Sequence, residues 1–336
     1  MTRLAAALLA GAAAAAAAAA GAAPLTGSLV GLYLLSGDAF TNLTMIAIDP
    51  ATGANRTVAN GLSLGDGLSQ IYPAVSALLP TGELAVAAAT ADAIYSFDVT
   101  TGARRTLAPL PPWGDGSDPY LALEFVAGEL YFLTQSGLST VSGGRLTQVA
   151  AYTTLPDEAV WALVPSGGTG GKGALVVGNA SMADGQHVQP TVFSIDFGAG
   201  YAVSAARSIN MTSKDGQFMD MWDLAWSPFL GKLWAFGGWY QSWLLSYPGW
   251  ALEYVQPVID GPGYPSVSAI SADGRAFAFL DFDSFHVIDL TASPPAYVVR
   301  AEFYAAPRRV GFMRWVGSSH AAAGVGAGVG AAAARV

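Results

Sequence analysis

A long-range repeat, a recurring turn and one surplus strand together predict an all-β fold, a six-bladed β-propeller of four-stranded antiparallel blades. The stretch YPAVSALLPTGELAVAAATADAIYSFDVT at 72–100 recurs as YPSVSAISADGRAFAFLDFDSFHVIDLT at 264–291. Each copy is typical of three short strands joined by tight turns, and such self-similarity indicates an array of structural repeats. The turn DPATG at 49–53 returns as DVTTG at 98–102, where it leads into the outermost strand of a unit.

In chain order, the pattern gives three strands, then five four-strand units, then a single strand. The three strands lie between 28 and 62, and the first unit therefore lacks an innermost strand. VGFMRWVG at 310–317 has the character of an innermost strand, so we expect it to complete that unit and close the ring. A seventh blade hidden in the long fourth unit is the alternative. The five complete units begin near residues 72, 118, 159, 222 and 264.

The segments that flank the predicted propeller at 28–317 favour export from the cell. Residues 1–23 place Arg3 ahead of an Ala/Leu run that ends in small residues, a pattern typical of a secretory signal peptide. An uncleaved membrane anchor is the alternative; after cleavage we expect no stable membrane span. Residues 318–336 are Ala/Gly-rich and predict a disordered tail, with a GPI anchor as the sharper alternative. Sequons that could be glycosylated in a secreted or cell-surface protein lie at Asn42, Asn55, Asn179 and Asn210.

The composition excludes several classes of function. The formal charge is -9 with only 15 basic residues and no basic run, which argues against a nucleic-acid partner. There is no cysteine, so disulfides and thiolate metal sites are excluded. GLSLG at 61–65 resembles the nucleophile elbow of hydrolases but lies in a loop between strands, and His187, His286 and His320 are poorly placed to complete a triad.

The loops that lead into the innermost strands repeat Asp-Gly pairs next to aromatic residues. In a propeller these loops open on one face around the central channel, where carboxylates could hold Ca²⁺ and aromatic rings could stack on sugars. The plainer interpretation is that Asp-Gly supplies turn chemistry and that the rings pack between blades. The candidates for ligand binding on this face are Tyr72, Tyr264, Trp113, Trp239, Tyr240, Arg308 and Arg309. The candidates for metal ligands are Asp118, Asp157 and Asp220.

Three charged residues, Glu124, Asp223 and Arg314, fall inside predicted innermost strands. Charged side chains survive there if they face a water-filled channel, and solvating that channel is their simplest role. Glu124, Asp223 and Glu158 are also the candidates for a catalytic base or metal ligand. The tryptophans of the fifth unit alternate along strands, so we expect most of them to pack in the core, with Trp239 and Tyr240 exposed.

The innermost VSA-type strand, the glycine hairpin and the strand endings IDPATG, FDVTTG and IDLTAS resemble secreted six-bladed propellers of the TolB-like, NHL-like and lactonase-like class. That scaffold serves binding proteins, hydrolases and dehydrogenases, so the resemblance implies architecture and leaves function open. The leading interpretation is a non-catalytic module that binds an extracellular glycan or protein through the acidic, aromatic channel face. The alternative is a Ca²⁺-dependent hydrolase of the lactonase or esterase type.

Overall fold

The structure is a computed structural model, and its described part runs from residue 27 to 317 with gaps. The predicted signal peptide at 1–23 and the predicted tail at 318–336 lie outside it. The described ranges are 27–34, 43–64, 74–88, 91–110, 118–153, 155–156, 159–165, 172–179, 182–183, 186–187, 189–212, 220–237, 241–255, 267–281, 284–302 and 309–317.

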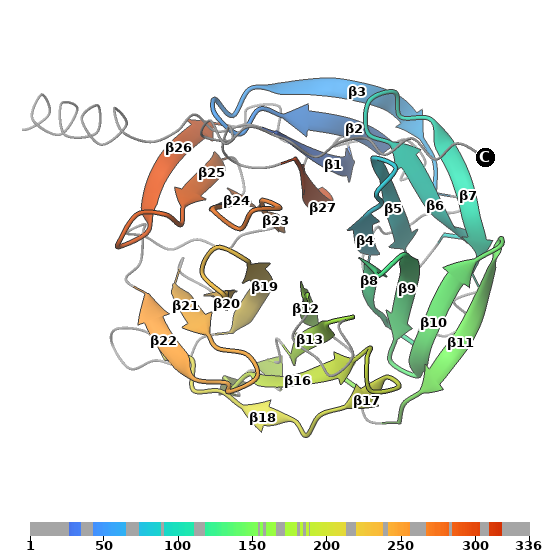
Figure 1. The fold of residues 1–336 in the computed structure, drawn as a ribbon. Helices are drawn as coiled ribbons and strands as arrows, with labels where there is room; N and C mark the ends of the chain where they lie inside the picture. Colours follow the sequence, from blue (N-terminus) through green and yellow to red (C-terminus); the bar gives the residue numbers. More distant parts are fainter. Residues whose placement is uncertain are drawn as a thin grey trace, which may run out of the picture.

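Six antiparallel sheets stand around a central channel, which confirms the predicted six-bladed propeller (Figure 1). Each sheet is a blade whose strands follow one another from the channel outward. Blade 1 consists of β27 (Arg309–Val316), β1 (Ser28–Leu34), β2 (Leu43–Ile48) and β3 (Asn55–Leu62). Blade 2 consists of β4 (Ala74–Leu78), β5 (Glu83–Ala88), β6 (Ala93–Asp98) and β7 (Arg104–Pro109). Blade 3 consists of β8 (Tyr120–Val126), β9 (Glu129–Thr134), β10 (Gly137–Ser142) and β11 (Arg145–Ala151).

The second half of the ring repeats this order with one irregular blade. Blade 4 contains β12 (Val160–Val164), β13 (Ala174–Asn179) and β16 (Thr191–Asp196), and its outer edge is split into β17 (Ala202–Val203) and β18 (Arg207–Ser208). A separate small hairpin pairs β14 (Met182–Ala183) with β15 (Gln186–His187). Blade 5 consists of β19 (Met221–Ser227), β20 (Lys232–Gly237), β21 (Ser242–Leu245) and β22 (Leu252–Val255). Blade 6 consists of β23 (Val267–Ile270), β24 (Ala276–Asp281), β25 (Ser284–Asp289) and β26 (Ala296–Glu302).

The break in the outer edge of blade 4 has a local cause. The sequence predicts one outer strand over 202–210, but the strand is interrupted after Val203. The Ser204 hydroxyl accepts a hydrogen bond from the Ser194 N–H at 2.9 Å, so a side-chain oxygen takes the place of a backbone carbonyl at that point of the ladder. Such local side-chain bonds compete with regular strand pairing.

The ring is closed by strands from opposite ends of the propeller, as predicted. β27 pairs antiparallel with β1, from Ser28 opposite Val316 to Leu34 opposite Arg309. Blade 1 is therefore the one blade assembled from two distant stretches of the described chain. This pairing removes the open sheet edges that a linear array would present to other chains.

The cores lie between neighbouring blades, where the faces of adjacent sheets meet. Between blades 5 and 6, Trp234, Phe236 and Phe277 are fully buried, and the centre of the Phe277 ring lies 6.0 Å from that of Trp234 and 5.4 Å from that of Phe236. Trp243 is buried between blades 4 and 5, which confirms the expected packing role for two tryptophans of the fifth unit. Among the described residues there is no helix with the length and apolar character needed to cross a membrane.

The recurring turns at 49–53 and 98–102, called the rim turns below, join the third and fourth strands of blades 1 and 2. In the second, Asp98 Oδ1 accepts hydrogen bonds from the N–H groups of Thr100 and Thr101 at 2.9 and 2.7 Å. The turn ends at Gly102 with φ of 72°, a conformation that favours glycine. A Cβ at Gly102 would lie closer than 3.0 Å to Ala59 in β3 of the preceding blade. The glycine is therefore required both by the backbone and by the contact between blades.

Candidate functional site

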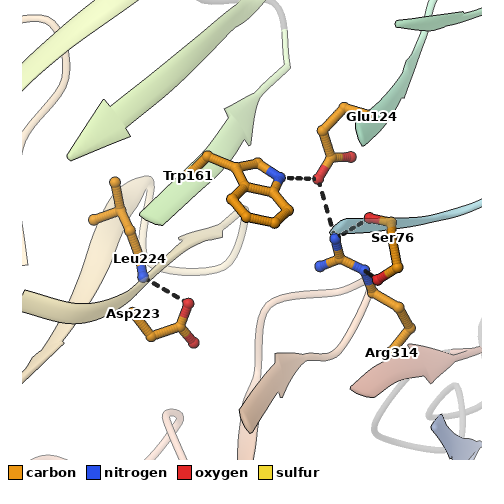
Figure 2. Close-up of polar contacts among 6 residues, drawn as sticks. All are labelled: Ser76, Glu124, Trp161, Asp223, Leu224 and Arg314. Atoms are coloured by element: carbon orange, nitrogen blue, oxygen red, sulfur yellow. Dashed lines mark hydrogen bonds and ion pairs between the residues drawn. The ribbon is translucent and has the colours of Figure 1, made fainter. Parts of the chain in front are cut away.

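Polar side chains from five innermost strands meet in the central channel, and we call them the channel cluster (Figure 2). Innermost strands form the wall of the channel, so a side chain that turns inward from them shares its space with side chains from other blades. The cluster consists of Ser76 in β4, Glu124 in β8, Trp161 in β12, Asp223 in β19 and Arg314 in β27. The sequence predicted the placement of Glu124, Asp223 and Arg314 in innermost strands facing a channel, and the structure confirms it.

Glu124 is the best satisfied carboxyl group of the cluster. Its Oε1 atom accepts a hydrogen bond from the Trp161 indole Nε1–H at 2.8 Å. The same atom lies 3.5 Å from the Arg314 Nη2 atom, which forms an ion pair across the channel. Burial raises the pKa of the Glu124 carboxyl, while Arg314 and then Trp161 oppose that rise. One carboxylate thus connects blades 1, 3 and 4.

Arg314 is held in place by two further bonds to Ser76. Its Nε–H donates to the Ser76 hydroxyl at 3.1 Å, and its Nη2–H donates to the Ser76 carbonyl oxygen. The guanidinium carbon also lies 5.8 Å from the centre of the Trp161 ring, within range of a cation–π attraction. Since Arg314 belongs to the closing strand, these bonds tie the ring closure to blades 2, 3 and 4.

Asp223 is less well satisfied than Glu124. A β-bulge at Trp222 interrupts the pairing of β19 with β20, and bulges redirect the side chains next to them. Asp223 Oδ1 accepts a hydrogen bond from the backbone N–H of Leu224 at 2.8 Å. Burial raises the pKa of Asp223 to about 7, against the smaller opposing effects of the Leu224 N–H and of Arg314. In Figure 2 the indole of Trp161 lies between Glu124 and Asp223, with Arg314 across from Asp223.

The bulge that precedes Asp223 leaves Trp222 at the surface. Its side chain is 43% exposed, whereas the following residues Leu224 and Ala225 are buried. Trp222 lies where the chain enters the innermost strand β19, on the side of the ring predicted to carry the binding face. Another exposed aromatic residue of this strand and its turn, Phe229, is 44% exposed and lies beyond the other end of β19, beneath the Arg275 guanidinium at 5.3 Å.

The predicted metal ligands that the structure describes do not gather at one point. Asp118 caps blade 3, where its two oxygens accept hydrogen bonds from the Ser136 N–H at 2.8 Å and the Ser136 hydroxyl at 2.7 Å. Asp220 lies just ahead of β19, and Asp157 falls outside the described residues. Within the described ranges, no group of three His, Asp or Glu side chains is arranged to hold a metal ion.

Most of the predicted ligand-binding face falls outside the described residues, so those predictions stand as they were made. This applies to Tyr72, Tyr264, Trp113, Trp239, Tyr240 and Arg308, and to Glu158 among the catalytic candidates. Arg309 is described only as the first residue of β27.

The described sequon residues differ in exposure, and the histidine of blade 6 is enclosed. Asn55 and Asn210 are exposed and Asn179 is half-buried, while Asn42 lies outside the described residues. His286 is 3% exposed and stacks on Phe279, with ring centres 4.7 Å apart. His286 thus lies inside a blade interface.

Two members of the channel cluster were not predicted as site residues. Trp161 and Ser76 fall in predicted innermost strands, and the sequence shows no charge or motif at either position. Their role depends on which side chains the closed ring places opposite them. One clue was present, since Trp161 interrupts an innermost strand that otherwise holds small and aliphatic residues.

Comparison with known proteins supports the fold alone. No protein-family model matches the sequence, and a search of curated proteins finds no match. A chain in the crystal structure of a nidogen/laminin complex is similar at a TM-score of 0.55 and 10% identity, over 88% of this chain and all of that one. A protein from Lactobacillus plantarum is similar at a TM-score of 0.51 and 14% identity, over 82% of this chain and 83% of that one.

TolB from Acinetobacter baumannii is also similar, at a TM-score of 0.48 and 14% identity, over 88% of this chain and 67% of that one. At identities this low, similarity of structure says nothing about ligand or reaction. The channel cluster must therefore be interpreted from its own chemistry. The fold of the chain is a six-bladed β-propeller, as its sequence repeats predicted.

Proposed function

We propose that the chain is a binding propeller, exported through its predicted signal peptide, that holds a glycan or protein ligand at the channel face bearing the loops into the innermost strands. The observation that supports this most directly is the state of the channel cluster. Arg314, Ser76, Trp161 and Glu124 are bonded to one another, so they form a fixed polar lining. A carboxylate held by an indole and a guanidinium is suited to shaping a site and poorly placed to accept a substrate proton.

The exposed side chain of Trp222 supports the same proposal. An indole at the mouth of a polar channel offers a flat apolar face beside hydrogen-bonding groups, a combination found in binding sites for sugars and for protein side chains. Propellers place such residues together by geometry, because innermost strands that run in the same direction begin on the same side of the ring.

The experiment compares two variants on a glycan array. We expect Trp222→Ala to lose most of the binding of the wild-type protein and Phe229→Ala to retain it, since the two rings are equally exposed at opposite ends of β19. Equal loss in both variants, or loss in Phe229→Ala alone, would contradict the assigned face. An array on which the wild-type protein binds nothing rejects the glycan part of the proposal.

A second function, a metal-dependent hydrolase, is favoured by one observation. The pKa of Asp223 is raised to about 7, which suits a general base that works near neutral pH. The test is turnover on a panel of lactones and esters with and without Ca²⁺, using wild-type, Asp223→Asn and Glu124→Gln proteins. Absence of turnover in the wild-type protein eliminates this function, and turnover that survives in both variants removes these residues from it.

A further inference from the structure

The two carboxyl groups of the channel cluster have unequal partners. Glu124 receives two hydrogen-bond donors from other blades, Trp161 and Arg314, and one of these carries a full positive charge. Among the described residues, the one hydrogen-bond donor to Asp223 is the backbone N–H of its own neighbour, Leu224. Asp223 is half-buried, so its carboxylate keeps only part of its hydration, and a counter-charge or further donors would lower its free energy. Asp223 has neither among the described residues.

Arg314 forms no ion pair with Asp223, and a guanidinium that moved closer would lose its present partners. Its Nε and Nη2 atoms are committed to Ser76, and Nη2 also faces Glu124. Turning toward Asp223 would break the bonds to Ser76 and leave Glu124 with Trp161 alone. The guanidinium therefore acts on Asp223 only from a distance, as the smallest of the effects on the pKa of that carboxyl.

The other innermost strands offer Asp223 no charge. Arg309 and Arg314 belong to β27, Tyr120 and Glu124 belong to β8, and Asp220 lies just ahead of β19. The described residues of β4, β12 and β23 contain no ionisable side chain. With both carboxyls ionised, this part of the channel carries two negative charges and one positive charge. The net charge of about −1 is located at Asp223, since Glu124 and Arg314 compensate each other.

We propose that Asp223 anchors the ammonium group of an alkylamine chain, such as a lysine side chain that a protein partner inserts into the channel. An ammonium group supplies the missing charge and donates hydrogen bonds to the oxygen that Leu224 leaves unused. The half-buried indole of Trp161, which lies between Glu124 and Asp223 in Figure 2, offers an apolar face to the methylene stem of such a chain. The inference rests on the proposed binding function and, of its two ligand classes, concerns the protein partner.

A divalent metal ion fits this site less well than an ammonium group. Divalent cations bind through several carboxylate or carbonyl oxygens, and the site has one uncompensated carboxylate with the Arg314 charge nearby. An amino sugar carries the same charge but presents a broad ring in place of a narrow stem. Both ligands are therefore included in the experiment as competing outcomes.

The pH dependence of binding follows from competition between the ammonium group and a proton. Asp223 must be ionised to hold a cation, and its pKa of about 7 places the proton in competition below neutral pH. At pH 6 about one molecule in ten would be ionised, so the affinity for an amine should be about tenfold weaker than at pH 8.

The experiment is calorimetric titration of the full-length protein with Nα-acetyl-lysine amide, whose ε-ammonium group is free, at pH 6 and pH 8. The neutral N-acetyl-norleucine amide, which has a similar stem, is the ligand control, and Phe229→Ala is the protein control because it lies in a turn beyond β19. We expect saturable binding at pH 8, about tenfold weaker binding at pH 6, at least tenfold loss in Asp223→Asn and no change in Phe229→Ala.

Several results would overturn the proposal. These are no binding of the lysine amide at pH 8, equal affinity for the norleucine amide, equal affinity at the two pH values, or tighter Asp223-dependent binding of glucosamine or CaCl₂. The wild-type pH series requires no variant, so the test survives if Asp223→Asn fails to fold. If only this inference fails, a glycan-array result that depends on Trp222 still supports the proposed function. The two proposals can therefore fail separately.

Discussion

The rim turns pack against neighbouring blades and recur in the sequence, whereas the channel cluster lies at the centre of the ring and has no repeated pattern. Each rim turn packs against the outer strand of the preceding blade, so the same arrangement is used twice, with Gly53 on Ala301 and Gly102 on Ala59. The channel cluster is used once, and each blade that contributes to it supplies a different residue type. Repeated motifs in the sequence therefore indicate the contacts between blades, whereas polar residues that occur once indicate the side chains that line the channel.

The largest loss of stability is expected when a methyl group is added to the glycine of a rim turn. Gly102→Ala should destabilise the protein by about 3 kcal/mol, because the new Cβ strains a backbone with positive φ and overlaps Ala59. Urea unfolding measures the change. Gly82→Ala is the matched control, with φ of 79° and no atom within 4 Å of the new Cβ, and should cost only about 1 kcal/mol.

The contact itself can be isolated by making room for the new methyl group. Ala59→Gly in the Gly102→Ala background should recover the steric part of the loss and leave the part due to φ. If Gly102→Ala and Gly82→Ala cost the same amount, the rim turn does not depend on the contact between blades.

The next effect is expected in the channel. Arg314→Met should cost about 2 kcal/mol, since it removes the donor to Ser76 and leaves Glu124 without its counter-charge in a partly solvated channel. The control is Arg105→Met at the surface pair with Glu83, where the arginine side chain is 58% exposed and the loss should be about 0.5 kcal/mol or less. Equal losses at the two sites would mean that the channel pair behaves like a surface pair.

A smaller effect is expected from the indole donor. Trp161→Phe removes the hydrogen bond to Glu124, and a double-mutant cycle with Glu124→Met, which lacks the acceptor oxygen, should give a coupling energy of about 1 kcal/mol. Thermal unfolding of the four proteins provides the measurement. Additive losses would show that the Trp161 contribution comes from packing alone.

The smallest effect is expected from Asp223, and it changes with pH. The pKa of Asp223 is raised from 3.8 to about 7 in the folded protein, so folding favours the protonated form. The contribution of this group to stability is full below about pH 4, falls as pH rises toward 7 and stays constant above it. Asp223→Asn should match the wild-type protein near pH 4 and exceed it near pH 8. The shift in pKa sets an upper limit of about 4 kcal/mol, and we expect solvent screening of this half-buried group to reduce the difference to on the order of 1 kcal/mol.

That comparison requires chemical denaturation at each pH. If the difference in unfolding free energy between the wild-type protein and Asp223→Asn stays constant from pH 4 to pH 8, the pKa of Asp223 is not raised. A variant less stable than the wild-type protein at pH 8 would show that Asp223 already has a compensating partner.

The sequence predicted the ring more fully than the site, for a physical reason. Strand alternation and turn chemistry are local, so the repeats at 72–100 and 264–291 were sufficient to define blades, and the surplus strand at 310–317 defined the closure. The broken outer edge of blade 4 was missed because it depends on a single hydroxyl, that of Ser204. Glu124, Asp223 and Arg314 were predictable as channel residues because charge in a buried strand is unusual.

The partners of those charges could not be predicted. Ser76 and Arg314 are separated by 238 positions, and their contact exists only in the closed ring. The difference between Glu124 and Asp223 has the same origin, because each is an acidic residue in an innermost strand. Only the closed ring shows that Trp161 and Arg314 lie beside Glu124 while Asp223 is left with Leu224.

The closure of blade 1 has a mechanical consequence. β1 and β27 are antiparallel, and Ser28 lies opposite Val316 at one end of the pair. Tension applied between these two residues would load the interstrand hydrogen bonds one after another from that end, as in unzipping, whereas shear would load them all together. Blade 1 would therefore open at low force, while the remaining blades, each formed from one continuous stretch of chain, would still be folded.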